Sequence, residues 1–408
     1  MLDVFLNSTR VGAIVREEHT AVISFVLDES YASLRQRPVL GQQFEERREH
    51  RVFRQARFPG ELPTFFANLL PEGALQAMVQ TQFAPGSAAD TLAIVGEDLP
   101  GAVIVRPTTD KVVVPPRARA FDEPGAIAPP VDGGMRFSLG GVQLKFSAVE
   151  SAEQRFTLPF RGMGGRWILK FGSETYPKLP ENEFVTMAWA AASGLNVPRH
   201  RLIAARDIEG LDERFHALGE HVFAIERYDR VVDGSRVHQE DFAQVRGLPP
   251  EMKYTGWSLD GLARFIGDLC GPEDLAEYLR RVLFLLLCCN TDAHLKNWSL
   301  IYPDGRTARL SPAYDFVCVR QYLPQDLALP LAKEKVLDRI TWEHIARVEK
   351  FLLKYGHDTD LVRTGREFVQ RCLDEWTRLR PLAQPEHQKT LDEHFSRSPL
   401  VRELGTTQ

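Results

Sequence analysis

Three side chains with oxygen atoms stand at a spacing that suits phosphoryl transfer. Asp292 and Asn297 lie five positions apart within Asn290–Asn297, and Asp315 follows next to an aromatic residue in Pro312–Phe316. Phosphotransferases of the protein-kinase type use this arrangement, with the first aspartate as base for a hydroxyl and the other two side chains as magnesium ligands. Magnesium prefers hard oxygen ligands, and an attacking hydroxyl needs a carboxylate within hydrogen-bond reach. The pattern therefore predicts a base at Asp292 and a magnesium site at Asn297 and Asp315.

The same stretch also has a purely structural interpretation. Asp and Asn are common in loops and at helix caps, and an aspartate five positions before an asparagine occurs often by chance. This interpretation leaves Asp315 unexplained, whereas the apolar run Val282–Cys289 before the stretch and Tyr314-Asp-Phe316 after it favour a phosphotransferase. The apolar run is far shorter than the roughly 20 residues of a membrane span, so we expect a buried helix and no membrane association.

A lysine at the end of an apolar strand is a candidate for binding phosphate. Lys170 ends Trp167-Ile-Leu-Lys170, and a lysine in such a strand must reach water or find a carboxylate or phosphate. We interpret it as the residue that holds the nucleotide phosphates, positioned by Glu183 or Glu181 in the next helix. A lysine at the surface end of a strand is the alternative.

A glycine-containing turn precedes this strand. The segment Phe137–Lys145 contains Gly140, Gly141, Val142 and Gln143. Paired glycines let the backbone approach phosphates and point its amides at them, although any hairpin can use such a pair. The position of the turn upstream of the strand lysine favours a phosphate-binding loop.

A charged segment, Glu226–Arg230, follows a strand and precedes the helical half of the chain, where a connector between two lobes would contact adenine. We expect its backbone to contact the edge of the base, with Glu226 and Tyr228 in the site. Asp229 or Arg230 would either reach the ribose or order the connector. A cluster of surface charges is the alternative.

The pattern of elements divides the chain into a β-rich half and a mostly helical half. Alternating and β-branched residues predict strands at 1–15, 21–27, 102–106, 135–138, 145–149, 156–158, 167–171 and 222–228. Helical periodicity predicts helices at 63–81, with an interruption at 71–73, and at 181–193, 262–269, 272–289, 342–355 and 361–382. The proline-rich segment 107–130 indicates a connection between domains. We expect an α+β fold whose two lobes enclose a nucleotide, with units at 1–110, 111–230 and 231–408.

Composition excludes several other classes of protein. A chain of 408 residues with 44% hydrophobic and 26% charged residues can form two or three ordinary globular units. Its net charge of -5 does not indicate nucleic-acid binding. The five cysteines are odd in number and form no C-x-x-C pair, which is typical of reduced thiols in a cytosolic protein. The amino terminus has no basic region followed by an apolar stretch, so we expect no export signal and a cytoplasmic location.

Together these motifs resemble the HipA family, the kinase toxins of bacterial HipBA toxin–antitoxin modules. Phe65–Gly73 resembles the hallmark of the family's amino-terminal domain, and Phe137–Lys145 resembles its phosphate-binding loop. The remaining segments follow in family order: 167–170, 182–184 with 194–198, 223–230 and 290–297. The resemblance spans almost the whole chain.

The resemblance implies a serine/threonine protein kinase with a two-lobed, protein-kinase-like fold that uses ATP and Mg²⁺. It implies that Asp292 is the catalytic base, that Asn297 and Asp315 hold magnesium, and that ATP contacts Lys170, His294 and Lys296 besides the loop and connector residues named above.

Ser138 falls where family members autophosphorylate, inside the phosphate-binding loop. A phosphoserine would add nearly two negative charges where the ATP phosphates must lie, so the loop would be expelled and the enzyme inactivated.

The resemblance also implies partners. Family substrates are aminoacyl-tRNA synthetases, usually glutamyl-tRNA synthetase, and their phosphorylation leads to growth arrest and persister cells. The usual partner is HipB, a helix-turn-helix antitoxin that represses the operon. This chain contains no helix-turn-helix motif that we recognise, so we expect DNA contact mainly through that partner.

Two positions depart from the common patterns, and two other functions stay open. The kinase D-F-G motif is Asp315-Phe-Val317 here, and the phosphate loop has Gln143-Leu-Lys145 where many relatives have Gln-Glu-Lys. A small-molecule kinase of the aminoglycoside or sugar type shares the Asp-x4-Asn spacing, but the block Phe66–Pro71 argues against it. An inactive corepressor scaffold would not need the complete set of catalytic side chains.

Overall fold

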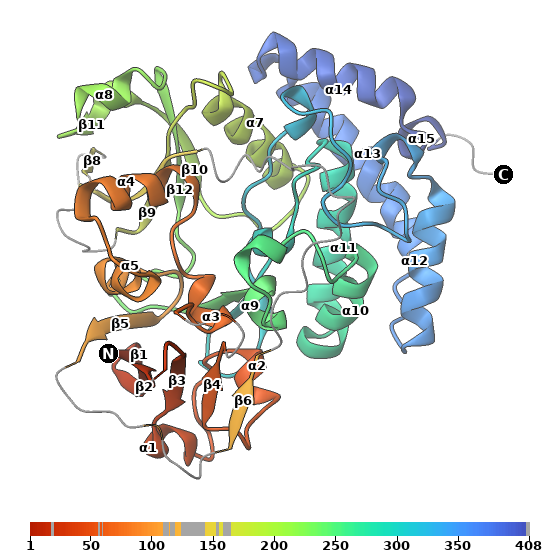
Figure 1. Ribbon diagram of the computed structural model, residues 1–408. Coiled ribbons are helices and arrows are strands. Elements are labelled where there is room, and N and C mark those ends of the chain that lie inside the picture. Colours follow the sequence, from red (N-terminus) through yellow and green to blue (C-terminus); the bar gives the residue numbers. More distant parts are fainter. Residues whose placement is uncertain are drawn as a thin grey trace.

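The computed structural model describes residues 1–17, 20–55, 58, 60–108, 114, 119–123, 143–151, 155–157 and 165–404. Within these ranges the chain forms two six-stranded sheets, a small three-stranded sheet and a large helical part. The first sheet lies at the lower left of Figure 1, the second at the upper left, and the long helices on the right. This is an α+β architecture, as the element pattern predicted.

The amino-terminal sheet has the strand order β5-β1-β2-β3-β4-β6. Its strands are β1 Leu2–Leu6, β2 Thr9–Arg16, β3 Ile23–Leu27, β4 Val52–Arg54, β5 Val103–Pro107 and β6 Ala120–Asp122. Alternating apolar residues bury one face of β1, as half-buried strands require. Five helices accompany the sheet: α1 Glu29–Ala32, α2 Gln42–Glu45, α3 Thr64–Ala67, α4 Gly73–Phe83 and α5 Ala88–Val95. Between sheet and helices lies an aromatic core that includes Phe25, Phe44, Phe53, Phe65 and Phe66.

The expected connection at 107–130 is in part a strand of this first sheet. β6 pairs in parallel with β4, and the buried carboxylate of Glu123 accepts hydrogen bonds from the backbone and hydroxyl of Thr64. Sequence analysis missed this strand because three residues are too few for a periodic signal, and prolines and glycines surround it. The strand predicted at 135–138 lies outside the described residues.

The second sheet has the order β10-β12-β9-β7-β8-β11. Its strands are β7 Lys145–Glu150, β8 Phe156–Thr157, β9 Trp167–Lys170, β10 His200–Ala204, β11 Ile208–Glu209 and β12 His221–Glu226. Helix α7, Leu179–Ala192, packs against β10 and β12, and the short α8 spans Glu213–His216. Lys170 lies in the middle of this sheet, paired with Lys145 on one side and Phe223 on the other.

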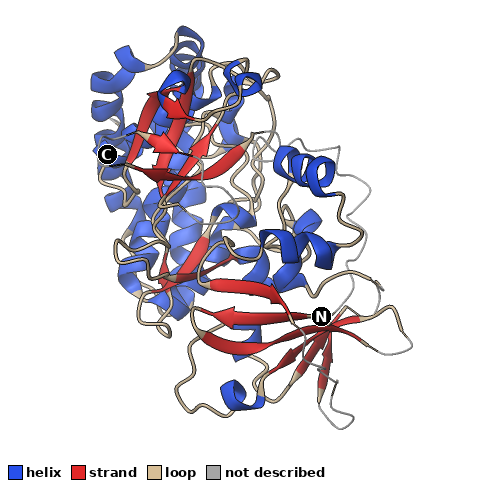
Figure 2. Ribbon diagram, turned by 90° about the vertical axis from the view of Figure 1, so that its left-hand side faces the viewer, coloured by secondary structure: helices blue, strands red, loops and turns tan. Residues whose placement is uncertain are grey.

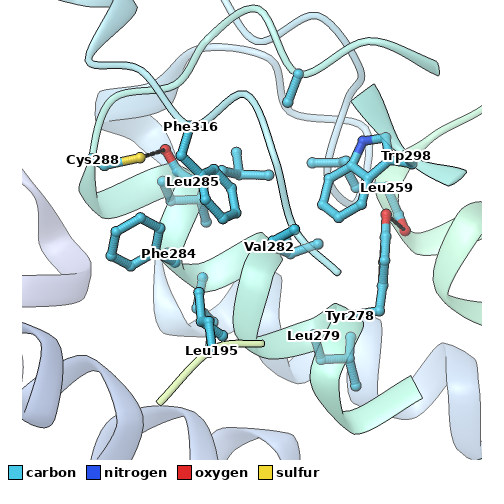
Figure 3. Close-up of a cluster of buried hydrophobic side chains, with 14 of the residues drawn as sticks. Leu195, Leu259, Tyr278, Leu279, Val282, Phe284, Leu285, Cys288, Trp298 and Phe316 are labelled. Carbon is cyan, nitrogen blue, oxygen red and sulfur yellow. Dashed lines mark hydrogen bonds between the residues drawn. The ribbon is translucent and has the colours of Figure 1, made fainter. Parts of the chain in front are cut away.

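The carboxyl-terminal half is mostly helical and includes a small sheet (Figure 2). Its helices are α9 Phe242–Arg246, α10 Leu259–Cys270, α11 Pro272–Leu287, α12 Trp342–Lys354, α13 Leu361–Leu379, α14 Pro385–Arg397 and α15 Pro399–Arg402. Its strands are β13 His238–Asp241, β14 Ser299–Tyr302 and β15 Arg309–Leu310. The apolar run before the candidate catalytic stretch is the end of α11, where side chains from α11 and neighbouring segments form one buried cluster (Figure 3). No helix in the part of the chain that the structure describes is long and apolar enough to cross a membrane.

The amino-terminal unit is bonded directly to the small sheet. The Gln42 amide donates to Glu240 at 2.9 Å, and the Val39 amide donates to the Gly305 carbonyl at 2.8 Å. His238 on β13 is 2.9 Å from the Leu40 carbonyl through Nε2, and its ring stacks on Tyr302. The first sheet and the helical half therefore form a continuous packed structure.

The buried His238 predicts a pH-dependent stability. Burial lowers the pKa of His238 from 6.5 to about 4, although the Leu40 carbonyl opposes this shift. Between these values the unfolded chain binds a proton at this site and the folded chain does not. The free energy of unfolding therefore falls as the pH drops through this window, by up to about 1.4 kcal/mol per pH unit. We expect His238→Gln to flatten this dependence in denaturant titrations across the window, and an unchanged slope would contradict the assignment.

Candidate active site

Lys170 connects the second sheet, α7 and the carboxyl-terminal half. It ends β9, it is 7% exposed, and its Nζ lies 2.5 Å from both Glu183 Oε1 and Asp315 Oδ1. Glu183 is on α7, which packs against β10 and β12 of the second sheet. Of the two glutamates that the sequence left open, the structure therefore brings Glu183 to the lysine, while Glu181 contacts His221.

The charges of this cluster favour an ionised Asp315. Burial alone would raise the pKa of Asp315, but the positive charges of Lys170 and Lys145 hold it well below its usual value. Burial raises the pKa of Glu183 to about 7, because the attraction of Lys170 offsets only part of the desolvation and Asp315 repels a second negative charge. Asp315, which faces the pocket, is thus the more acidic of the two carboxylates.

Asp315 adopts a backbone conformation that is uncommon for residues with a side chain. Its φ is +64°, in the left-handed region that aspartate tolerates better than most residues. Such a conformation persists only when surrounding contacts hold it. Asn290 Nδ2 donates to the Asp315 carbonyl at 3.0 Å, and the next ring, Phe316, packs edge-on against Phe284 of α11 (Figure 3). This turn has Val317 where the D-F-G motif has glycine, and its residue with left-handed backbone is Asp315.

Asn297 and Asp292 converge on the same place. Asn297 Nδ2 lies 2.5 Å from Asp315 Oδ2, and its Oδ1 accepts from the His294 amide at 3.0 Å. Asp292 is 7% exposed and accepts a hydrogen bond from the Tyr254 hydroxyl at 2.9 Å. One pocket is lined by Gln143, Leu179, Asn290, Asp292, Asn297, Asp315, Val317 and Val319.

The donors at this pocket fit magnesium that arrives with a nucleotide. The described residues contain no group of three or more His, Cys, Asp or Glu side chains that could hold a metal ion by themselves. Magnesium bound with nucleotide phosphates typically uses only one or two protein carboxylates, because phosphates and water complete its six ligands. The ionised Asp315 and the amide oxygen of Asn297 are donors of that kind, although the amide oxygen must turn away from the His294 amide to contribute.

The predicted connector is clamped to the amino-terminal unit. Asp229 accepts from Arg227 at 2.9 Å and from Arg230 at 2.8 Å, and both arginines also contact Asp98. The Gly101 amide donates to Asp229 at 2.7 Å, and a Cβ at this glycine would lie 2.7 Å from the Gln239 amide nitrogen. All three connector side chains are buried. Of the two roles left open for Asp229 and Arg230, the structure places them where they order the connector.

The other two connector residues have different surroundings. Glu226 forms an ion pair with Arg166 across the sheet, and the Arg227 amide donates to the Arg166 carbonyl at 2.7 Å. Tyr228 is half-buried, with its ring centroid 6.0 Å from that of Tyr314, the residue before Asp315.

Lys296 faces the amino-terminal unit, whereas the ring of His294 packs edge-on against Tyr254. Lys296 Nζ donates to the carbonyl of Asn68 at 2.8 Å and to its side-chain oxygen at 3.1 Å. His294 is buried, and its pKa is lowered to about 3 by desolvation and by the charge of Lys253. These two residues, expected to contact ATP, are thus held by contacts that sequence analysis did not anticipate.

Some predicted residues are outside the described ranges, and some residues of the site were missed. Ser138, Gly140, Gly141 and Val142 lie outside the described residues, whereas Gln143 lines the pocket. Sequence analysis missed the roles of Tyr254, Asn290, Lys145 and Arg227. Asn290 and Lys145 stand in the quoted motifs, and Arg227 stands between two predicted residues, so their positions gave a signal. Tyr254 is 38 positions from its partner Asp292, and no spacing in the sequence indicates that contact.

Comparison with known proteins defines the class of protein. A chain of the Shewanella oneidensis HipA–HipB–operator DNA complex superposes with a TM-score of 0.71 and 20% identity, covering 100% of this chain and 97% of the other. The two-lobed, kinase-like fold is therefore confirmed. A model of the HipA N-terminal domain matches residues 2–106, and a model of the HipA-like C-terminal domain matches residues 137–376.

This chain belongs to the HipA family. A Sinorhizobium fredii protein named "Putative kinase Y4dM" is 34% identical over 99% of this chain and 98% of its own length. The Shewanella oneidensis protein named "Serine/threonine-protein kinase toxin HipA" is 28% identical over 67% of each chain. The chain thus resembles proteins named as kinases along its whole length.

The connector clamp predicts a large loss of stability when its shared carboxylate is neutralised. Asp229→Asn leaves the buried guanidinium groups of Arg227 and Arg230 with less compensating charge, which typically costs about 3–5 kcal/mol. We expect a clearly lower midpoint in chemical denaturation. The matched control Asp207→Asn changes an exposed aspartate and should leave the midpoint unchanged, and equal effects of the two substitutions would contradict the clamp.

Proposed function

We propose that this protein is a serine/threonine protein kinase that transfers the γ-phosphate of ATP to a protein hydroxyl. The observation that carries the proposal is the continuous set of contacts Glu183–Lys170–Asp315–Asn297 beside Asp292, at one pocket between the second sheet and the helical half. Phosphoryl transfer depends mainly on positioning and on stabilising charge, which such a set can supply. The family membership and the names of the relatives support the same activity.

Each side chain has a distinct proposed role. Asp292 accepts the proton of the attacking hydroxyl, because it is the pocket carboxylate that already accepts a hydroxyl hydrogen bond, from Tyr254. Lys170 neutralises charge on the phosphates, and Glu183 keeps its ammonium group in place. Bound magnesium would supply positive charge between the phosphate oxygens.

Asp315 and Asn297 would hold that magnesium through their oxygens. The charge of that magnesium, together with Lys170, would lower the energy of a transition state rich in negative charge.

We further propose that the kinase is the toxin of a toxin–antitoxin pair in the cytoplasm, with a HipB-like helix-turn-helix protein as its partner and an aminoacyl-tRNA synthetase as its substrate. The structural neighbour was solved with HipB and operator DNA, and a relative is named as a toxin, which supports this partner class. With a net charge of -5, this chain would contact DNA mainly through its partner.

Asp292→Asn tests the activity itself. This substitution keeps the shape of the side chain and removes the proton acceptor, so we expect phosphoryl transfer to protein to fall by at least about 100-fold. Labelled ATP with magnesium and purified protein measures the transfer, and phosphoproteomics after induction of the two forms identifies the substrate. Label on a metabolite and never on protein would indicate a small-molecule kinase. No transfer by either form, with unchanged toxicity, would indicate a scaffold.

Ser138→Ala tests autophosphorylation as self-inactivation. A phosphate on Ser138 would repel the phosphates of ATP, so the wild-type enzyme should lose activity during incubation with magnesium and ATP. We expect the variant to keep its initial rate over the same incubation, followed by mass spectrometry of the peptide that contains residue 138. Equal rates of inactivation for the two proteins would overturn this role.

A further inference from the structure

A carboxylate from the amino-terminal domain lies between two lysines of the kinase half. Glu72 precedes α4, and its oxygens lie 2.8 Å from Lys253 Nζ and 3.5 Å from Lys296 Nζ. Both lysine side chains are almost fully buried, at 11% and 14% exposed. An isolated ammonium group is costly to bury, so each lysine needs a compensating charge at this place.

A second contact from the same domain fixes the geometry. Asn68, at the end of α3, accepts from Lys296 through its carbonyl and its side-chain oxygen, and its Nδ2 donates to the Leu248 carbonyl at 2.7 Å. Helix α3 packs against α9 of the kinase half. Figure 1 shows α3 beside α9. The segment from Asn68 to Glu72 is therefore a bridge between the domains.

The two lysines belong to the segments that hold the catalytic groups. Lys253 precedes Tyr254, whose hydroxyl donates to Asp292, and the Lys253 carbonyl accepts from the Leu295 amide at 3.0 Å. Lys296 precedes Asn297, whose amide contacts Asp315. Through Lys253 and Lys296, one carboxylate of the amino-terminal domain thus restrains two segments. One carries the hydroxyl that contacts the candidate base, and the other carries the amide of the candidate magnesium ligand.

Other charged and titratable groups face the same cluster. Asp241, the cap of α9, lies 3.1 Å from Lys296, and the buried ring of His294 stands beside the lysines. Although burial opposes it, the charges of Lys296 and Lys253 hold the pKa of Glu72 at about 2, so Glu72 is ionised throughout the neutral range. Without Glu72, Asp241 would be left to compensate two ammonium groups.

We propose that Glu72 is a positioning residue of the kinase: through Lys253 and Lys296 it holds Tyr254 against Asp292 and Asn297 against Asp315. The amino-terminal domain then completes the active site of the adjoining lobes. This inference rests on the proposed kinase activity, and it assigns a role in that activity to a residue that does not touch the nucleotide pocket.

Glu72→Gln tests the inference with little change of shape. Lys296 is directed to Asn68 and Asp241 and does not line the pocket, and the contacts of Lys170, Glu183 and Asp315 are untouched. The KM for ATP should therefore stay within about twofold, whereas kcat for phosphoryl transfer should fall by about tenfold or more. Glu97→Gln is the matched control, because Glu97 lies in the same domain and forms an exposed ion pair with Arg106. We expect the control to keep both constants.

A double substitution separates positioning from simple loss of stability. If Glu72 acts through Lys253, then adding Lys253→Met to Glu72→Gln should lower kcat by much less than the product of the two single effects. Multiplicative effects would show that the two residues act independently and would overturn the inference.

Hydrogen exchange of the stretch 290–298 provides a measurement that does not require catalysis. Its amides should exchange faster in Glu72→Gln than in the wild type and the Glu97→Gln control, while those of α13 stay unchanged. If the wild type shows no phosphoryl transfer but the stretch still exchanges faster in Glu72→Gln, the positioning contact is supported and the proposed kinase activity is contradicted. Unchanged exchange and unchanged kcat in an active enzyme would overturn the inference and leave the proposed function standing.

Discussion

The structure depends on one buried lysine that serves two carboxylates. Lys170 pairs with Glu183 of α7 and with Asp315 of the carboxyl-terminal half, so it joins the two lobes at the pocket. A buried lysine without partners would be strongly destabilising, and the two carboxylates compensate its charge. The left-handed backbone of Asp315, held by Asn290, keeps its carboxylate at the pocket.

The amino-terminal domain is bonded to the rest of the chain at three separate places. It contributes Asp98 to the buried arginine cluster of the connector, Gln42 to the small sheet, and Glu72 to the lysines beside the candidate base. Two of these contacts pair a buried cationic side chain with a partly buried carboxylate, so their geometry is restrictive. The domain is thus packed as a structural part of the site, and its removal would take away part of the charge that compensates buried arginine and lysine side chains.

Sequence analysis named candidate catalytic residues from local spacing, and it did not find the contacts between domains. The spacing around Asp292 and Asn297 lies within one short segment, and local spacing is visible in a sequence. The helices from 259 to 379 were predicted to within a few residues because their apolar periodicity is strong. Strand β6 was missed because it has three residues, and the partners of Asp229 were missed because Asp98 lies 131 positions away in a different domain.

The sequence by itself determined the family and the α+β class, and it named Asp292 and Lys170 as candidates for the site, because these depend on residue types at short, fixed spacings. Only the tertiary structure decided between Glu181 and Glu183, and it placed Asp229 and Arg230 in the clamp of the connector. It alone brought Glu72 to Lys253 and Lys296. The physical reason is that charge compensation in a buried site depends on distances in space, and residues far apart in the chain leave no common pattern in the sequence.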